Sequence, residues 1–275
     1  MRLKNVYKID EELARRRVRT MANVAVAQML PLSAVKGGTS LNLRRGPKES
    51  RFSLDLDATR PRDTSESEFL DELEQNLKHG WNGFRGTLVR RPKASPKNVP
   101  PRYVMQPVDV NVTYNNSTFA KVTLELAFDE LGSVGETTDV IAVEIVELFT
   151  SVGLSAPSPV AVLSIEHQVV QKLHACTTLN PRGTNERAHD LVDLQLLCDD
   201  EDIDFPEMDA LGSRLFSFRK GEEWPPIVTA HAGWGELYSE ASEGLDVRPL
   251  KDAIVWINSL VAEAVSSGST VPKDE

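Results

Sequence analysis

The sequence predicts an α+β protein in which a mixed α/β half precedes an all-helical half. In the first half, strand-like alternation of apolar and polar residues, clearest over 122–128, is interspersed with helical segments. After residue 164 the apolar spacing is helical throughout. The stretch 155–159, Ser-Ala-Pro-Ser-Pro, has the composition of a linker. We therefore expect one domain over residues 1–154 and a second over 155–275.

The spacing of apolar residues and the positions of helix-breaking residues predict where the helices and strands of each half lie. In the first half a helix is expected from a cap at Asp10 to about Leu30, where Pro31 ends it. Further helices are expected from Thr39 and over 64–77, and strands over 32–35, 52–58, 87–91, 103–114 and 122–128. Residues 139–149 fit either a strand or a helix. In the second half we expect helices over 164–177, 185–198, 208–218, 234–242 and 249–265.

Composition bounds the class of protein. The chain has 275 residues, a net charge of −10 and ordinary globular proportions of apolar and charged residues. Residues 1–110 nevertheless carry 21 Lys and Arg against 13 Asp and Glu, so this part is basic and the remainder strongly acidic. Such asymmetry is typical of a protein that meets an anion, nucleic acid included, although an unevenly solvated surface also explains it.

The cysteine content and the N-terminal segment indicate the cellular compartment of the protein. Only Cys176 and Cys198 are present, which argues against a disulfide scaffold or a cysteine-based zinc site and favours a reducing cytoplasm. A basic run at 15–19 followed by apolar residues imitates a signal peptide, but acids precede it and Gln28 and Pro31 interrupt it. We expect an N-terminal helix there and no membrane span or membrane partner.

A glycine turn and a pair of aspartates form the first candidate site. Gly37 and Gly38 lead into a helix, and Thr39 and Ser40 follow them with hydroxyl groups. Downstream, two aspartates alternate with apolar residues in Leu54-Asp55-Leu56-Asp57, so both carboxylates face one side of a strand. Carboxylates beside backbone N–H groups suit a divalent metal holding a polyphosphate. The alternative is a coincidence of a turn with an exposed acidic strand.

A third carboxylate would complete a two-metal site. Asp109 and Glu125 both qualify, because each is an acid flanked by apolar residues in a strand-like run. For either one, an exposed face of an antiparallel strand is the simpler explanation.

Two helices of the second half carry charges on apolar faces. Lys172 falls in the stripe of its helix, where it needs an acid or a substrate phosphate as partner unless it extends from the edge. Asp190 and Asp193 share a face of the next helix, near Arg187. A structural salt bridge to Lys172 and a catalytic role are both open. No Gly-x-Ser-x-Gly, Walker A or HExxH motif occurs, so hydrolase and P-loop classes have no support.

Taken in order, four segments resemble one known family. They are Lys36-Gly37-Gly38-Thr39-Ser40-Leu41, Arg51-Phe52-Ser53-Leu54-Asp55-Leu56-Asp57, Gln171-Lys172-Leu173-His174-Ala175 and Arg187-Ala188-His189-Asp190-Leu191-Val192-Asp193-Leu194. This set is similar to the AbiEii/AbiGii nucleotidyltransferase-like toxins, which include the MenT toxins. The resemblance implies a polymerase β-like nucleotidyltransferase domain over 1–154 and a helical domain over 155–275 that completes the active site.

The resemblance also implies an activity. It implies a toxin that uses magnesium and a nucleoside triphosphate to add nucleotides to an RNA acceptor, with the 3′ end of tRNA as that acceptor in MenT-like members, and so blocks translation. A cognate antitoxin protein or kinase-like antitoxin would restrain it. Carried over by position, the phosphate-binding residues are Lys36, Gly37, Gly38, Thr39, Ser40, Ser53 and Lys172, the metal ligands are Asp55, Asp57 and Glu125, and the catalytic residues are Asp55, Asp57, Lys172, Asp190 and Asp193.

Two other readings stay open. A catalytically degenerate member would bind RNA or a partner without reaction, and an active member would transfer to a protein hydroxyl instead of RNA. If RNA is the acceptor, we expect basic loops to hold its backbone, those around Arg44, Arg45, Lys48, Arg90, Arg91, Lys93 and Lys97.

Overall fold

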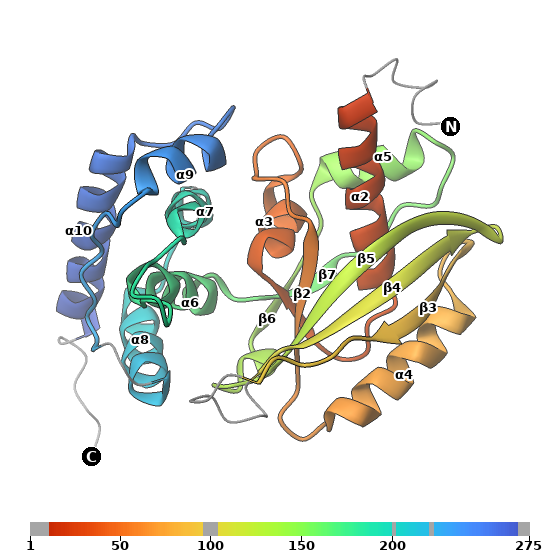
Figure 1. The fold of residues 1–275 in the computed structure, drawn as a ribbon, viewed down its shortest axis with the longest axis horizontal. Helices are drawn as coiled ribbons and strands as arrows, with labels where there is room; N and C mark the ends of the chain where they lie inside the picture. The colour runs from red at the N-terminus through yellow and green to blue at the C-terminus, as the bar shows by residue number, and fades with distance from the viewer. Residues whose placement is uncertain (1–10, 96–103, 200–201, 220–222, 269–275) are drawn as a thin grey trace. The chain divides into compact units, whose positions relative to one another are not determined.

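The computed structural model describes residues 11–95, 104–199, 202–219 and 223–268. The chain divides into two compact units, Met1–Leu163 and Ser164–Glu275. We call the first the sheet unit and the second the helical unit. The expected α+β class, with a mixed sheet first and helices after it, is confirmed (Figure 1).

The sheet unit is built on one seven-stranded mixed sheet in the order β3-β4-β5-β2-β1-β7-β6. Pairing is antiparallel except between β2 and β5 and between β1 and β7, which are parallel. The strands are β1 (Ala34–Lys36), β2 (Asp55–Arg60), β3 (Phe84–Arg90), β4 (Gln106–Tyr114), β5 (Ser117–Phe128), β6 (Thr137–Val140) and β7 (Val160–Leu163).

Helices cover the sheet and supply the core of this unit. They are α2 (Glu11–Ala27), α3 (Gly37–Arg45), α4 (Glu66–His79) and α5 (Val143–Thr150), with a short 3-10 helix, η2 (Ser133–Gly135), before β6. The apolar faces of α2 and α4 pack with the even-numbered residues of β4 and β5 in one core, Met21 and Leu73 with Val110 and Leu124 among them. The α4 helix starts in a complete capping box, in which Ser65 and Glu68 satisfy each other's backbone N–H groups.

Several boundaries differ from the sequence-based expectation. The strand expected over 52–58 begins only at Asp55, because residues 51–54 make no strand pairing. The ambiguous stretch 139–149 divides between β6 and α5. The expected cap Asp10 lies outside the described residues, as does residue 103.

The division between units also falls later than the expected boundary at 154/155. Residues 155–159 have no regular structure, as a linker would, but β7 follows them and pairs with both β1 and β6. The sheet therefore keeps its last strand, and the helical unit begins at Ser164, whose side chain caps the next helix by accepting from the His167 N–H.

The helical unit contains the five expected helices with shifted ends. They are α6 (Ile165–Thr177), α7 (Ala188–Cys198), α8 (Phe205–Arg219), α9 (Trp234–Ala241) and α10 (Leu250–Gly268). The α7 helix starts later than expected because Asn185 anchors the preceding loop, donating to the carbonyls of Ala175, Cys176 and Thr178.

A polar network and an apolar core hold these helices together. Leu173, Leu194, Leu211 and Trp234 are fully buried. Gln195 of α7 donates to the Tyr238 hydroxyl of α9, which donates in turn to the Arg248 carbonyl. No described helix combines the length and apolar composition needed to cross a bilayer.

Candidate functional site

Three charged side chains form a row across neighbouring strands of the sheet unit. Lys36 at the end of β1 lies opposite Asp57 of β2, and Asp57 lies opposite Glu125 of β5. Residues opposite one another in a sheet project from the same face, so the three side chains share one face. Asp55, two residues before Asp57, projects from this face as well, opposite Thr123. The two aspartates predicted to share a face therefore do, and Glu125 joins them.

The N-terminus of α3 meets this row at Gly37. Gly37 has φ +65°, a conformation that favours glycine, and a Cβ there would stand 2.3 Å from Oδ2 of Asp57. A Cβ on Gly38 would stand 3.0 Å from Oγ of Ser53. Both glycines therefore permit a close approach between the first turn of α3 and the start of β2. N–H groups in the first turn of a helix have no partner within the helix, and they favour anions.

The hydroxyl groups predicted to bind phosphate are engaged with the backbone. Thr39 Oγ1 and Ser53 Oγ both donate to the carbonyl of Asp55, at 2.7 and 3.0 Å. Ser40 Oγ donates to the carbonyl of Gly37 at 2.8 Å. These contacts fix the loop before β2 against α3, and so they set where the Asp55 and Asp57 carboxylates emerge.

The electrostatics of the row suit a divalent cation. Partial burial raises the pKa of Glu125, and the charges of Asp57 and Asp55 raise it further, while Lys36 and Arg91 oppose them. A bound cation would reduce the repulsion between these carboxylates, and carboxylate oxygens are among the ligands that magnesium prefers. The donor chemistry therefore fits the metal. Within the described ranges, no three His, Cys, Asp or Glu side chains are already drawn together as a complete metal site.

Asp109, the other candidate for the third carboxylate, has different partners. It lies on β4, opposite Thr123, and its side chain is 11% exposed. Lys121 Nζ lies 2.7 Å from Asp109 Oδ2, and Arg91 Nη1 lies 3.7 Å from Oδ1. The charge of Asp109 is thus already balanced by two cations, whereas Glu125 faces two acids.

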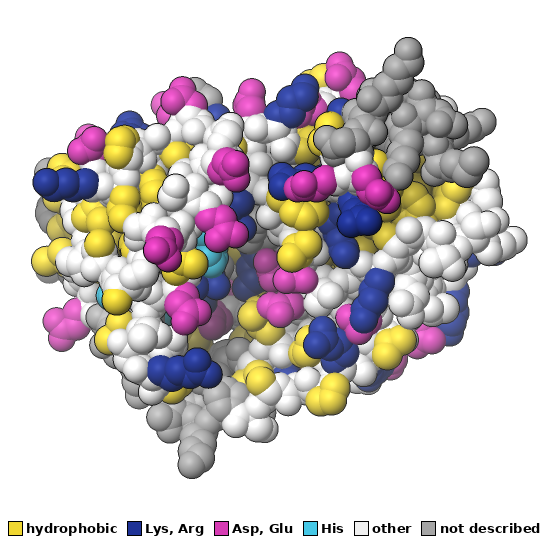
Figure 2. All heavy atoms as spheres, turned by 45° about the horizontal axis from the view of Figure 1, so that its top comes forward, with side chains coloured by type: hydrophobic (Ala, Val, Ile, Leu, Met, Phe, Trp, Pro, Cys, Tyr) yellow, Lys and Arg dark blue, Asp and Glu magenta, His cyan; other side chains and the backbone are white. Residues whose placement is uncertain are grey.

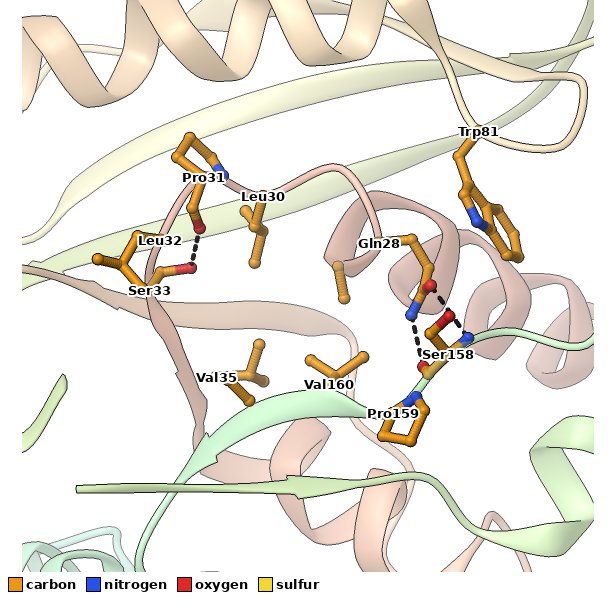
Figure 3. Close-up of a pocket in the computed structure, with 12 residues that line it drawn as sticks. Gln28, Leu30, Pro31, Leu32, Ser33, Val35, Trp81, Ser158, Pro159 and Val160 are labelled. Carbon is orange, nitrogen blue, oxygen red and sulfur yellow. Dashed lines mark hydrogen bonds between the residues drawn. The ribbon is translucent and has the colours of Figure 1, made fainter. Parts of the chain in front are cut away.

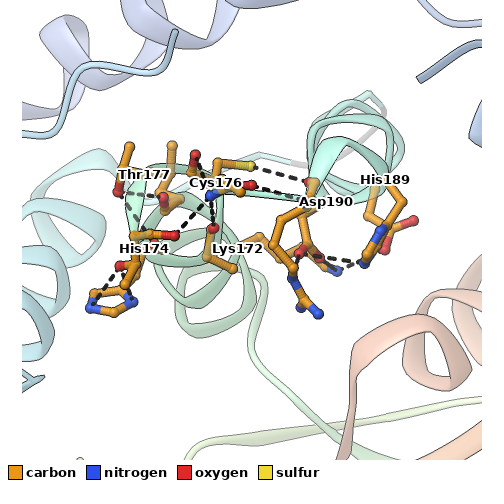
Figure 4. A network of polar contacts seen from close by, with 12 residues as sticks. Lys172, His174, Cys176, Thr177, His189 and Asp190 are labelled. Carbon is orange, nitrogen blue, oxygen red and sulfur yellow. Dashed lines mark hydrogen bonds and ion pairs between the residues drawn. The ribbon is translucent and has the colours of Figure 1, made fainter. Parts of the chain in front are cut away.

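In the helical unit the predicted lysine and aspartates form one buried network (Figure 4). Lys172 Nζ of α6 donates to Asp190 Oδ1 at 2.9 Å and to Asp193 Oδ2 at 2.7 Å, both on α7. Arg187 Nε donates to the second oxygen of Asp190 at 2.6 Å, and His189 Nε2 lies 3.6 Å from that oxygen. The acid partners expected for Lys172 are present within its own unit.

Burial and pairing act against each other in this network. Desolvation lowers the pKa of Lys172, but Asp190 and Asp193 outweigh it and hold the pKa above its usual value. Desolvation likewise raises the pKa of Asp190, and Lys172 and Arg187 more than compensate. Lys172 and Asp190 are therefore both charged near neutral pH.

Most of the basic side chains expected to hold RNA have acidic or backbone partners. Lys48 pairs with Glu144 at 2.5 Å, Arg90 with Asp71 at 2.7 Å, and Lys93 with Glu66 at 2.6 Å. Lys97 lies outside the described residues. Figure 2 shows one face on which Lys and Arg side chains lie among Asp and Glu side chains. The basic composition of residues 1–110 is therefore largely offset locally.

Sequence reasoning gave no role to two basic residues beside the predicted ones. Arg51 has its Nη2 3.6 Å from where a Gly38 Cβ would stand, so it lies beside the glycine turn. Its position in the sequence, two residues before the predicted phosphate-binding residue Ser53, could have indicated that it lies near the site. Lys121 joins Asp109 through strand pairing alone, which no local pattern signals.

A cavity of about 500 Å³ lies elsewhere in the sheet unit (Figure 3). It is lined by the segment between α2 and β1, Trp81, and residues 158–161, and Gln28 and Ser158 exchange hydrogen bonds at its edge. None of the predicted site residues lines it.

Comparison with known proteins identifies the family. No curated protein sequence matches the chain. Among solved structures, MenT4, the nucleotidyltransferase toxin Rv2826c from Mycobacterium tuberculosis H37Rv, is similar over 98% of this chain and 99% of its own, with 18% identity and a TM-score of 0.50, which supports a shared fold. A family model described as "Nucleotidyl transferase AbiEii toxin, Type IV TA system" matches residues 19–253. The chain therefore belongs to the AbiEii family of nucleotidyltransferase toxins of type IV toxin–antitoxin systems.

Proposed function

We propose that this toxin transfers a nucleotide from a nucleoside triphosphate to RNA, with the 3′ end of tRNA as acceptor, and thereby blocks translation. The observation that carries the proposal is the group of three carboxylates, Asp55, Asp57 and Glu125, at the N-terminus of α3. It brings metal-binding oxygens next to N–H groups suited to phosphate, the two requirements of nucleotidyl transfer.

Each group of residues at this site has a distinct task in the proposal. The first turn of α3 and Lys36 hold the phosphates, and Asp55, Asp57 and Glu125 hold magnesium. Magnesium, when bound, supplies Lewis-acid stabilisation of the triphosphate and of the attacking hydroxyl. Thr39 and Ser53 position the carboxylates by fixing the backbone of Asp55. We assign the third carboxylate to Glu125, because Asp109 is balanced by Lys121 and Arg91.

The helical unit has a predicted share in the reaction. Resemblance to the family implies that Lys172 neutralises triphosphate charge with support from Asp190 and Asp193. Their mutual ion pairs support a structural task at least as strongly. We propose both, and the two are separable by mutation.

As a type IV toxin the chain has a cognate antitoxin. A kinase-like antitoxin and a cytoplasmic site of action are further proposals, the second because tRNA and nucleoside triphosphates meet there.

The acceptor and the base are tested together by sequencing. Purified protein is incubated with magnesium, bulk tRNA and one nucleoside triphosphate at a time, and the tRNA 3′ ends are sequenced. Added nucleotides at the 3′ end with at least one of the four triphosphates are expected. Unchanged 3′ ends with all four would overturn transfer to the tRNA 3′ end.

Two further experiments distinguish the alternatives. Mass spectrometry of toxin co-expressed with its antitoxin would reveal a nucleotide added to a protein hydroxyl. Toxicity that persists in Asp57→Ala, with no nucleotide added to RNA or protein, would identify a binding protein instead.

A further inference from the structure

The face of the sheet that carries Asp57 and Glu125 continues outward over β5, β4 and β3. Side chains alternate between faces, so the odd-numbered residues of β5 from Lys121 onward, and of β4 up to Asn111, point to this face while α2 and α4 pack against the other. Asn111 of β4 and Thr87 of β3 are exposed on it. Val89 of β3, opposite Asp109, is exposed there too. An exposed, mainly polar face therefore extends from the carboxylates.

Two cations on this face are held by one buried acid. Asp109 is 8% exposed, and it pairs with Lys121 on the neighbouring strand and with Arg91, just after β3. The side chains of Lys121 and Arg91 remain 59% and 50% exposed. Asp109 thus holds Lys121 closely, at 2.7 Å, and attracts Arg91 from 3.7 Å, without covering either cation. Arg91 is also fixed through its backbone, because its N–H donates to the Pro107 carbonyl.

This cluster is adjacent to the proposed active site. Thr123 lies directly between the two, opposite Asp55 on one side and opposite Asp109 on the other. Lys121 precedes Glu125 by four residues on the same strand, which corresponds to roughly 13 Å along β5. Lys121 is therefore too far along the strand to share the phosphates held at Gly37. Arg91 lies closer to the carboxylates, because it is hydrogen-bonded to Pro107, the residue opposite Glu125, and its charge lowers the pKa of Glu125. Both cations are within reach of an acceptor strand that ends at the carboxylates.

We propose that Arg91 and Lys121, positioned by Asp109, bind the phosphodiester backbone of the RNA acceptor next to the reacting 3′ end. The inference rests on the proposed function and assigns its acceptor path. Two exposed cations against one buried carboxylate leave a net positive charge, which complements a polyanion. An exposed strand face admits an extended single strand, and the tRNA 3′ end is single-stranded.

The test compares four variants with the wild type in the full chain. Lys121→Gln and Arg91→Gln each remove one cation. The double variant Asp109→Asn, Lys121→Gln removes both members of the Lys121–Asp109 ion pair, so that no buried carboxylate is left without its lysine partner. Lys78→Gln is the control, since Lys78 is an exposed lysine on α4 with its own acidic partner, Glu74. Circular dichroism melts establish that each variant folds.

Two affinities are measured for each protein. Binding of 5′-labelled bulk tRNA is followed by anisotropy at several salt concentrations, and binding of each nucleoside triphosphate with magnesium by calorimetry. We expect Lys121→Gln and Arg91→Gln to weaken tRNA binding about five- to tenfold and to reduce the salt slope by about 0.7 each. Triphosphate binding should be unchanged in Lys121→Gln and should change less than tRNA binding in Arg91→Gln, whose charge also acts on Glu125. Lys78→Gln should match the wild type.

The contrary results are distinct. Wild-type tRNA affinity and salt slope in both single variants and the double variant would overturn the inference, and so would a loss of triphosphate affinity with tRNA binding intact. Failure of the wild type itself to add nucleotides to any tRNA would instead overturn the proposed function, whatever the variants bind.

Discussion

Gly37 shows how one residue shapes the site. Its positive φ starts α3 directly against β2, and the missing Cβ leaves the space that the Asp57 carboxylate occupies. The sequence predicts a glycine turn before a helix and two aspartates on one strand face. That the turn and the carboxylate touch could not be predicted, because the contact depends on the antiparallel register of β1 and β2.

Gly37→Ala therefore has two effects. It places a side chain in the left-handed region, which costs about 1–2 kcal/mol, and it displaces Asp57. We expect lower stability and a fall in transfer rate of roughly 10²-fold. The control is Gly153→Ala, with φ +79° and no atom within 4 Å of its Cβ. Urea unfolding and labelled-nucleotide transfer measure the two effects, and equal transfer rates in both variants would contradict the account.

The charge of Glu125 should destabilise the folded protein when no metal is bound. Because Asp57 and Asp55 repel its charge, Glu125→Gln should raise the melting temperature in EDTA at pH 7, by about 2 °C for a half-exposed group. Magnesium should then stabilise the wild type more than the variant, and transfer activity should be lost. Glu72→Gln, on the exposed side of α4, should change none of these. A variant that melts lower than the wild type in EDTA would rule out this repulsion.

At the scale of elements, helix α6 is joined to α7 by ions rather than by apolar contacts alone. Periodicity alone placed Lys172 on an apolar stripe and the two aspartates on one face, and the structure confirms that they meet. Periodicity could not separate a structural pair from a catalytic one, since both need the same residues at the same spacing.

Lys172→Met should destabilise the helical unit by about 3–5 kcal/mol, because two buried carboxylates lose their shared cation. Lys251→Met, an exposed lysine on α10, is the control. Denaturant unfolding gives the difference, and a variant as stable as the control would exclude the structural task. The triple variant Lys172→Met, Asp190→Asn, Asp193→Asn should recover much of the stability. If it folds but transfers no nucleotide, the network also serves the reaction.

Strand boundaries were the weakest part of the prediction at this scale. Residues 51–54 continue the alternation of β2 but pair with no strand, so β2 begins with Asp55 itself. The carboxylates therefore emerge at the first turn of α3, where Thr39 and Ser53 hold the chain. Alternation reports which face a residue prefers, and pairing decides where a strand starts.

For the whole chain, the order of a mixed sheet followed by helices was predictable, and the strand order was not. The β5 strand inserts beside β2, far from it in sequence, and this pairing alone brings Glu125 to Asp57. The basic composition of the first half was also a poor guide to a binding surface, because most of those cations pair with nearby acids.

Stability of the whole chain should depend on His174 in mild acid. Burial, and then Arg219, lower its pKa to about 4, so the unfolded chain takes up a proton first as the pH falls. The free energy of unfolding should therefore decrease between about pH 6.5 and pH 4, by at most about 3 kcal/mol. His174→Gln should flatten this part of the profile, while His79→Gln, at the exposed end of α4, should keep it. Identical profiles in all three proteins would refute the assignment.

The central claim is that the site formed by the carboxylates of Asp55, Asp57 and Glu125 beside α3 performs nucleotidyl transfer to RNA. The most direct measurement is transfer of label from α-phosphate-labelled nucleoside triphosphate to bulk tRNA by the wild type, Asp57→Asn and Asp63→Asn. Asp63 is an exposed aspartate in the turn after β2. We predict magnesium-dependent labelling by the wild type and Asp63→Asn, and a loss of roughly 10²-fold or more in a folded Asp57→Asn protein. Undiminished labelling by Asp57→Asn would contradict the claim.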